Sequence, residues 1–151
     1  CQKSGVFPIT DERMTRFNIT LQQGVDFVLQ CLEKMWGGEL FMPKIPSYKI
    51  TDVAMAINSD CKLEIIGIRP GEKLHEEMIT LTDALNTVEF EDHYVILPAS
   101  PPRWDIQKFI QSSDCSSGKI VSESFSYNSS TNKKFLTIKE LQLLINNEFN
   151  A

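Results

Sequence analysis

A short apolar run that ends in a charged turn constrains this sequence more than any other feature. The run Lys62–Ile68 contains the residues Ile65-Ile66-Gly67-Ile68, and continuous apolar residues of this kind predict a β-strand buried on both faces. It follows residues 50–57, where apolar side chains recur at helical spacing. Because strands that alternate with helices pair in parallel, we predict an α/β fold, with a small mixed sheet and helices.

The turn after this strand is the first candidate for a ligand site. Arg69 follows the strand directly, and ligands of α/β proteins commonly bind where strands end. Its planar guanidinium fits phosphate and carboxylate groups better than a lysine does. Pro70 restricts Arg69 to an extended backbone, and Gly71 permits a sharp turn that brings Glu72 back towards the same ligand. The alternative is a polar surface loop in which Glu72 only neutralises Arg69 or Lys73.

A second arginine, Arg16, lies directly before the first predicted helix. If the strand end and the helix start converge, Arg16 and Arg69 can grip a pyrophosphate between them. A carboxylate at Glu72 can then accept the hydroxyl groups of a ribose. The alternative is that both arginines form surface ion pairs with Asp11, Glu12 or Glu72, which would contribute at most about 1 kcal/mol.

Two capping boxes predict where helices begin. Thr20 and Gln23 precede the first helix, and Thr137 and Glu140 precede the last one. We also expect a strand over residues 39–42, one or two helical turns over 75–81, and two strands or a hairpin over 87–97. The apolar stripe of the first helix is expected to lie in the core; it consists of Leu21, Val25, Val28, Leu32 and Met35.

Composition and motifs exclude several classes of function. The net charge of −5 argues against general nucleic-acid binding. No apolar run approaches the roughly 20 residues that span a bilayer, and no signal-peptide pattern is present, so we expect a cytoplasmic protein with no membrane partner. The cysteines have no zinc-ligand spacing and are expected to be reduced thiols; they are Cys1, Cys31, Cys61 and Cys115.

No complete active site is visible in the sequence. His75-Glu76-Glu77-Met78-Ile79 begins like the zinc motif HExxH but has isoleucine at the second ligand position, so no metal site is expected. Motifs of the GxSxG, P-loop and GxGxxG types are also missing. Because the chain begins with Cys1 rather than methionine, we expect it to be a fragment.

Several segments together resemble a known enzyme family. The segments are "PITDERMTRF", "GVDFVL", "GGELFMPKIPSYKITDVAMAI" and "IIGIRPGEKLHEEMI". They are similar to the C-terminal half of inverting UDP-N-acetylglucosamine 4,6-dehydratases, which are extended short-chain dehydrogenases/reductases of pseudaminic acid biosynthesis. The resemblance is dense over residues 8–98 and thinner beyond them, where it depends on Trp104, "SFSYNSS" and "FLTIKEL".

The resemblance implies a substrate-binding part without its catalytic half. In that family the N-terminal half supplies the Rossmann sheet, the NADP loop and a Tyr-x-x-x-Lys catalytic pair. None of the three tyrosines here is followed by a lysine four residues later; they are Tyr48, Tyr94 and Tyr127. We therefore expect no catalytic residue in this chain, no bound NADP and no activity of the chain alone. The alternative is a free-standing nucleotide-sugar-binding or assembly module that never had a catalytic half.

Carried over residue by residue, the resemblance assigns a UDP-sugar site. Arg16 and Arg69 would hold the diphosphate, Glu72 the uridine ribose, and the segment Pro8-Ile9-Thr10 the uracil end. The parent reaction oxidises C4 of the sugar with NADP⁺ and eliminates water across C5 and C6, after which hydride returns at C6 with inversion at C5. Implied partners are the missing N-terminal Rossmann half and further copies in a homo-oligomer.

The same reading divides the chain into three regions. Residues 1–97 form the nucleotide-sugar-binding region. Residues 98–134 are rich in Ser, Asn and Pro and are expected to be mostly irregular. Residues 135–151 contain a C-terminal helix that packs on the same domain.

Overall fold

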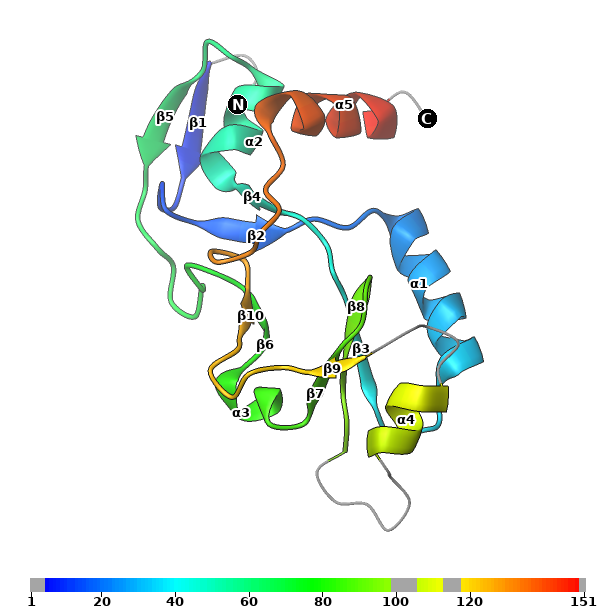
Figure 1. The fold of residues 1–151 in the computed structure, drawn as a ribbon. Helices are drawn as coiled ribbons and strands as arrows, with labels where there is room; N and C mark the ends of the chain where they lie inside the picture. The colour runs from blue at the N-terminus through cyan, green and yellow to red at the C-terminus, as the bar shows by residue number, and fades with distance from the viewer. Residues whose placement is uncertain (1–4, 99–105, 113–117, 150–151) are drawn as a thin grey trace. The chain divides into compact units, whose positions relative to one another are not determined.

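The computed structural model describes residues 5–98, 106–112 and 118–149 (Figure 1). The chain divides into two compact units, each assembled from separate stretches of sequence. Unit 1 comprises Cys1–Asn18, Ile45–Glu76 and Asn128–Ala151, and unit 2 comprises Ile19–Lys44 and Glu77–Tyr127.

Unit 1 contains two small strand pairs. Strands β1 (Val6–Ile9) and β5 (Lys62–Ile65) are parallel, with Val6 opposite Lys62 and Ile9 opposite Ile65. Strands β2 (Thr15–Phe17) and β4 (Ser47–Lys49) are antiparallel. Two helices complete the unit, and they pack on one another in a core that includes Ala56, Leu136 and Leu141; they are α2 (Ile50–Ile57) and α5 (Ile138–Phe149).

The segment before α5 fastens the C-terminal part of unit 1 to β4. The Ser47 amide donates to the Lys134 carbonyl at 2.9 Å, and the Leu136 amide donates to the Ser47 carbonyl at 2.8 Å. The side-chain amide of Asn132 donates to the Ile45 carbonyl at 2.8 Å and to the Ser47 hydroxyl at 3.0 Å. Residues 132–136 therefore run beside β4 much as an additional strand would.

Unit 2 is built on a four-stranded antiparallel sheet with the order β3-β8-β7-β9. These strands are β3 (Leu40–Pro43), β8 (His93–Ile96), β7 (Thr87–Glu89) and β9 (Lys119–Ile120). The core of the unit is formed by Val88, Phe90, Val95, Leu97 and Phe109. The other elements are α1 (Leu21–Lys34), β6 (Glu77–Ile79), α3 (Leu81–Ala84), α4 (Ile106–Ser112) and β10 (Tyr127–Asn128), whose first residue ends the unit.

The predicted mixed α/β class is confirmed. Both predicted capping boxes are present: Thr20 with Gln23 at α1, and Thr137 with Glu140 at α5. Residues 87–97 form the expected hairpin of β7 and β8. These features depend on residues that lie close together in the sequence, so a local pattern predicts them.

Several expectations were wrong. The buried strand is shorter than predicted and lies at the surface, with Ile65 54% and Ile66 50% exposed. The β1–β5 pair is parallel, as is an isolated bridge between Ser47 and Phe135, whereas β2–β4 and the pairs of the four-stranded sheet are antiparallel. Residues 75–80 are not helical: residues 77–79 form β6, and the capping box of Thr80 and Asp83 begins α3 only at Leu81.

The division of the chain into three consecutive regions stays a prediction. The two compact units do not test it, because each is assembled from separate stretches of sequence. In the segment expected to be irregular, α4, β9 and β10 are ordered elements. Residues 99–105 and 113–117, Trp104 among them, lie outside the described residues.

Candidate functional site

All six predicted binding residues belong to unit 1 and lie at or near one edge of its parallel pair. Because β1 and β5 run in the same direction, their carboxyl ends meet at that edge. The Ile66 amide donates to the Ile9 carbonyl at 2.9 Å, which continues the pairing one step beyond β5. Thr10 follows β1, and the turn at Arg69 follows β5 at the same edge.

The turn Arg69–Glu72 has the predicted geometry. The Glu72 amide donates to the Arg69 carbonyl at 3.0 Å, and Gly71 has a φ of 81°. Proline second and glycine third, with that positive φ, are typical of a type II turn. The Glu72 carboxylate accepts a hydrogen bond from the Arg69 amide through Oε2 at 3.1 Å. The turn is therefore closed from both ends by the residues predicted to bind ligand.

The side chain of Arg69 is exposed. Within the described part of the chain, its guanidinium has no hydrogen bond or ion pair, and Glu72 is not its ion-pair partner. The alternative in which Arg69 and Glu72 only neutralise each other thus loses its geometric basis. An unpaired guanidinium on a fixed turn is well suited to an anion.

Arg16 is placed differently. Its side chain is only 20% exposed, and its two terminal nitrogens donate to three backbone carbonyls: Thr15 at 2.7 Å, Leu74 at 3.2 Å and Lys73 at 2.9 Å. Its Nε lies 3.4 Å from a carboxylate oxygen of Glu76. The contribution of Arg16 to a phosphate clamp stays a prediction, and in the structure its guanidinium fork is directed at the loop after Arg69.

A cluster of two buried hydroxyls and one partly buried imidazole lies next to Arg16. The Thr15 hydroxyl is 2.8 Å from Nδ1 of His75 and 2.7 Å from the Ser129 hydroxyl. Ser129 is fully buried, and its Oγ accepts the Glu76 amide at 2.9 Å. No local sequence pattern predicts this cluster, because Thr15 and Ser129 are 114 residues apart.

The residues of the segment Pro8-Ile9-Thr10 differ in burial. Pro8 is exposed, whereas the Ile9 side chain is 5% exposed and belongs to the core. The Thr10 hydroxyl donates to the sulfur of Met14 at 3.4 Å. A role for this segment beside a base stays a prediction.

The exposed guanidinium of Arg69 favours anion binding at this edge. Among the residues described, no group of histidine, cysteine, aspartate and glutamate could hold a metal ion. Neither strand of the parallel pair leads into a helix, because β1 is followed by a turn and β5 by the loop through Arg69. The strand–loop–helix cradle that holds a dinucleotide pyrophosphate is thus not formed by these residues, which do not fit NADP. No helix in the described ranges is long and apolar enough to cross a membrane.

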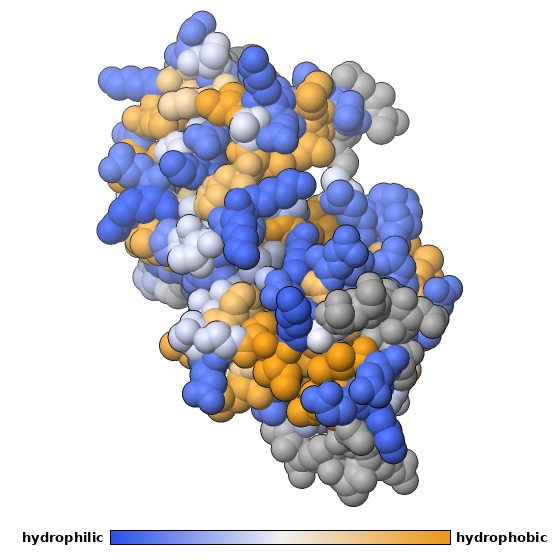
Figure 2. Space-filling view, in the orientation of Figure 1, coloured by the Kyte–Doolittle hydropathy of each residue, from blue (hydrophilic) through white to orange (hydrophobic). Residues whose placement is uncertain are grey.

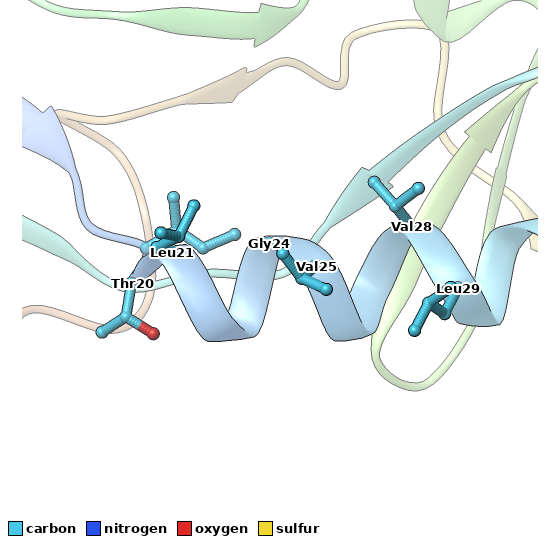
Figure 3. A pocket seen from close by; sticks show the side chains of 7 residues that line it. Thr20, Leu21, Gly24, Val25, Val28 and Leu29 are labelled. Atoms are coloured by element: carbon cyan, nitrogen blue, oxygen red, sulfur yellow. The ribbon is translucent and has the colours of Figure 1, made fainter.

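Unit 2 carries a separate apolar surface on α1. The expectation that this stripe lies in the core was wrong, because α1 has no buried residue and its apolar side chains are 45–86% exposed at Leu21, Val25, Val28, Leu29 and Leu32. We call these five residues the α1 face. Figure 3 shows most of them along the helix, where they line a shallow hollow of about 500 Å³ with Gly24. Hydrophobic residues also reach the surface elsewhere (Figure 2).

Comparison with known proteins gives consistent matches. A family profile described as "Polysaccharide biosynthesis protein" matches residues 1–98. The UDP-N-acetylglucosamine 4,6-dehydratase (inverting) of Campylobacter jejuni strain 81-176 is 48% identical over 96% of this chain and 43% of that protein. The UDP-glucose 4-epimerase of Rickettsia conorii is 36% identical over 60% of this chain and 28% of that protein.

A solved structure has the same fold. Pen from Bacillus thuringiensis matches 99% of this chain and 44% of its own, with a TM-score of 0.74 and 25% identity. The chain therefore spans less than half the length of each of these relatives.

Proposed function

Because this chain belongs to the polysaccharide biosynthesis protein family, we propose that it is the UDP-sugar-binding part of an inverting UDP-N-acetylglucosamine 4,6-dehydratase. The observation that carries the proposal is the guanidinium of Arg69, which has no partner among the described residues and lies on a turn closed by Glu72. The similarity to the Campylobacter dehydratase over nearly the whole chain supports the choice of substrate.

Each residue of the turn has a role in this proposal. Arg69 contacts the diphosphate with its two-pronged fork. Glu72 uses one carboxylate oxygen to hold the Arg69 amide, and its other oxygen accepts a ribose hydroxyl. The segment 8–10 lines the uracil end, and Arg16 lies at the base of the loop. The described residues bind and orient the sugar nucleotide, and they carry no general base for the elimination.

The rest of the enzyme is proposed to supply the chemistry. NADP is held by an N-terminal Rossmann half and provides hydride transfer there. The α1 face supports a second half of the protein. Its five apolar side chains are exposed in this chain, and contiguous exposed apolar residues are typical of a surface that another part of the protein covers. The pathway is proposed to be of the pseudaminic acid type.

The test is the substitution Arg69→Lys in the complete enzyme. Lysine keeps the charge but loses the bidentate geometry, so UDP affinity should fall roughly ten- to a hundredfold, or about 1.5 to 3 kcal/mol. Glu72→Gln should cost less, because an amide oxygen still accepts one hydrogen bond. Calorimetric titration with UDP measures both changes.

Arg13→Lys is the matched control. Arg13 is also an exposed arginine of unit 1, but its guanidinium is paired with Asp11 at 2.7 Å. UDP affinity should be unchanged in this variant. Wild-type affinity in Arg69→Lys, with circular dichroism showing an intact fold, would mean that Arg69 is an ordinary surface residue and that the site is wrongly assigned.

A further inference from the structure

We propose that the outer edge of β5 pairs with the same edge of a second copy of this chain. The two β5 strands run antiparallel about a two-fold axis at Leu63, and the strand pairs of the two copies join into one sheet with the order β1-β5-β5-β1. The pairing does not depend on which ligand the Arg69 turn binds.

One edge of β5 is open. Among the described strands, β5 pairs only with β1 (Figure 1). The amides of Lys62 and Ile66 donate to carbonyls of the β1 segment at 2.8 Å and 2.9 Å, so these two residues direct their backbone groups towards β1. Alternate residues of a strand direct theirs the opposite way. Leu63 and Ile65 therefore present their N–H and C=O groups to the outer edge.

This open edge combines apolar and charged side chains. Ile65 is 54% and Ile66 is 50% exposed, and exposed apolar residues on an open strand edge favour the addition of a strand from another chain. Charged side chains can prevent such pairing, and β5 has two exposed ones, Lys62 and Glu64. Because their signs are opposite, they block some registers and favour another.

Charge complementarity selects the register. In an antiparallel pair, residues with outward backbone groups lie directly opposite one another, which permits two-fold axes at Leu63, Glu64 or Ile65. An axis at Leu63 places Lys62 of each copy opposite Glu64 of the other. An axis at Glu64 places two carboxylates opposite each other, which is unfavourable. An axis at Ile65 places both charged residues opposite apolar ones. Only the axis at Leu63 pairs every charge.

The same register uses the open backbone groups. The two Leu63 residues exchange a pair of N–H to C=O hydrogen bonds, and the Ile65 amide of each copy donates to the Cys61 carbonyl of the other. The Cys61 amide already donates to the Asn58 carbonyl at 3.2 Å, so the ladder ends there. An interface of this length gives a weak dimer whose population depends on concentration.

The pairing leaves both ligand edges open. The two β5 strands run in opposite directions, so their carboxyl ends, and with them the two Arg69 turns, lie at opposite ends of the joined sheet. UDP affinity should therefore be the same in the monomer and the dimer. A chain that dimerises as described below but does not bind UDP would refute only the proposed function.

The first experiment changes the charges and measures dimerisation of the chain by sedimentation equilibrium up to about 1 mM. Lys62→Glu places carboxylates opposite each other and should weaken the dimer at least about tenfold. Glu64→Lys should do the same with ammonium groups. The double variant Lys62→Glu/Glu64→Lys restores opposite charges and should dimerise to within about threefold of the wild type. An equimolar mixture of the two single variants should form a heterodimer, since each supplies the charge that the other lacks.

Lys49→Glu is the matched control. Lys49 is an exposed lysine of unit 1 at the end of β4, so the variant makes the same change in net charge away from β5. Its dimerisation should equal that of the wild type.

A second experiment reads the register in the complete enzyme, whose other surfaces can also associate. Ile65→Cys places a thiol opposite Cys61 of the other copy, and directly opposite residues of this kind have Cα atoms about 5.5 Å apart, which suits a disulfide. Mild oxidation should therefore link position 65 of one copy to Cys61 of the other in a covalent dimer, identified by mass spectrometry of the linked peptides. The same substitution in a Cys61→Ser background should form no link at position 65.

Three results would overturn the inference. One is a wild-type chain that stays monomeric up to about 1 mM. Another is dimerisation that is equally strong in Lys62→Glu and Glu64→Lys, which would assign it to another surface such as the α1 face. The third is a link between position 65 of both copies in the Cys61→Ser background, which would show the wrong register.

Discussion

At the scale of single residues, Tyr94 shows how one side chain of unit 2 responds to its surroundings. Its ring is 8% exposed and lies 5.2 Å from the ring of Tyr127. Lys44 is 4.8 Å from the ring centroid, and its ammonium group pairs with Glu89 at 2.8 Å. Burial, with the negative charge of Glu89 as a further cause, raises the pKa of Tyr94 to about 12.

This raised pKa predicts a loss of stability in alkali. The folded state favours the neutral phenol, so the stabilisation is complete below the unfolded pKa of 10.0 and is lost as the pH rises towards 12. Urea unfolding at pH 9 and pH 11.5 should therefore show a falling free energy of unfolding, and Tyr94→Phe should reduce that fall. An equal fall in both proteins would contradict the assignment.

The predicted binding residues show what sequence can and cannot state at this scale. Pro70 and Gly71 determine a turn locally, and the turn that holds Arg69 and Glu72 is present. The carbonyl partners of Arg16 could not be foreseen, since backbone carbonyls have no signature in sequence. Ser129 enters the same network from far along the chain, which no local pattern records.

At the scale of elements, α1 has a start that sequence predicts and a burial that it does not. Its capping box is local, and the helix ends at Lys34, just before Gly37 and Gly38, whose φ angles are 108° and 94°. Amphipathic periodicity indicates which face is apolar, but not whether that face is covered by residues of the same chain. The α1 face was therefore identified correctly and assigned to the core wrongly.

Gly24 in the middle of α1 provides a test of this element. A methyl group added there meets nothing within 4 Å, and alanine favours a helix over glycine by about 0.5 to 1 kcal/mol. Gly24→Ala should therefore stabilise this chain by about that amount in urea unfolding. In the complete enzyme the gain should be smaller or reversed, because the added methyl lies on the hollow lined by the α1 face.

Gly38→Ala is the comparison for this substitution. Its φ of 94° is strained for any residue with a side chain, and the added carbon would lie 3.4 Å from Pro98. This variant should lose stability in both proteins. A destabilised Gly24→Ala chain would show that the surroundings of α1 are more crowded than the structure indicates.

At the scale of the whole molecule, the chain should bind without catalysing. Incubated with UDP-N-acetylglucosamine and NADP⁺, it should form no 4-keto product, because the described residues provide neither a dinucleotide cradle nor a base at the substrate. The complete enzyme, assayed in parallel, should form it. Turnover by the chain alone would refute the division of labour proposed here. If the protein is instead a free-standing binding module, neither sample would form the product.

The ties between Thr15 and Ser129 also have a consequence for the order in which the protein is made. Unit 1 needs partners separated by 114 residues, and its core includes Leu136 and Leu141 from the last part of the chain. On the ribosome, β1, β2 and the Arg69 turn are synthesised long before these partners exist. Contacts of such long range also slow folding after release. The edge that carries the Arg69 turn therefore cannot be completed before Ser129, Leu136 and Leu141 have been synthesised.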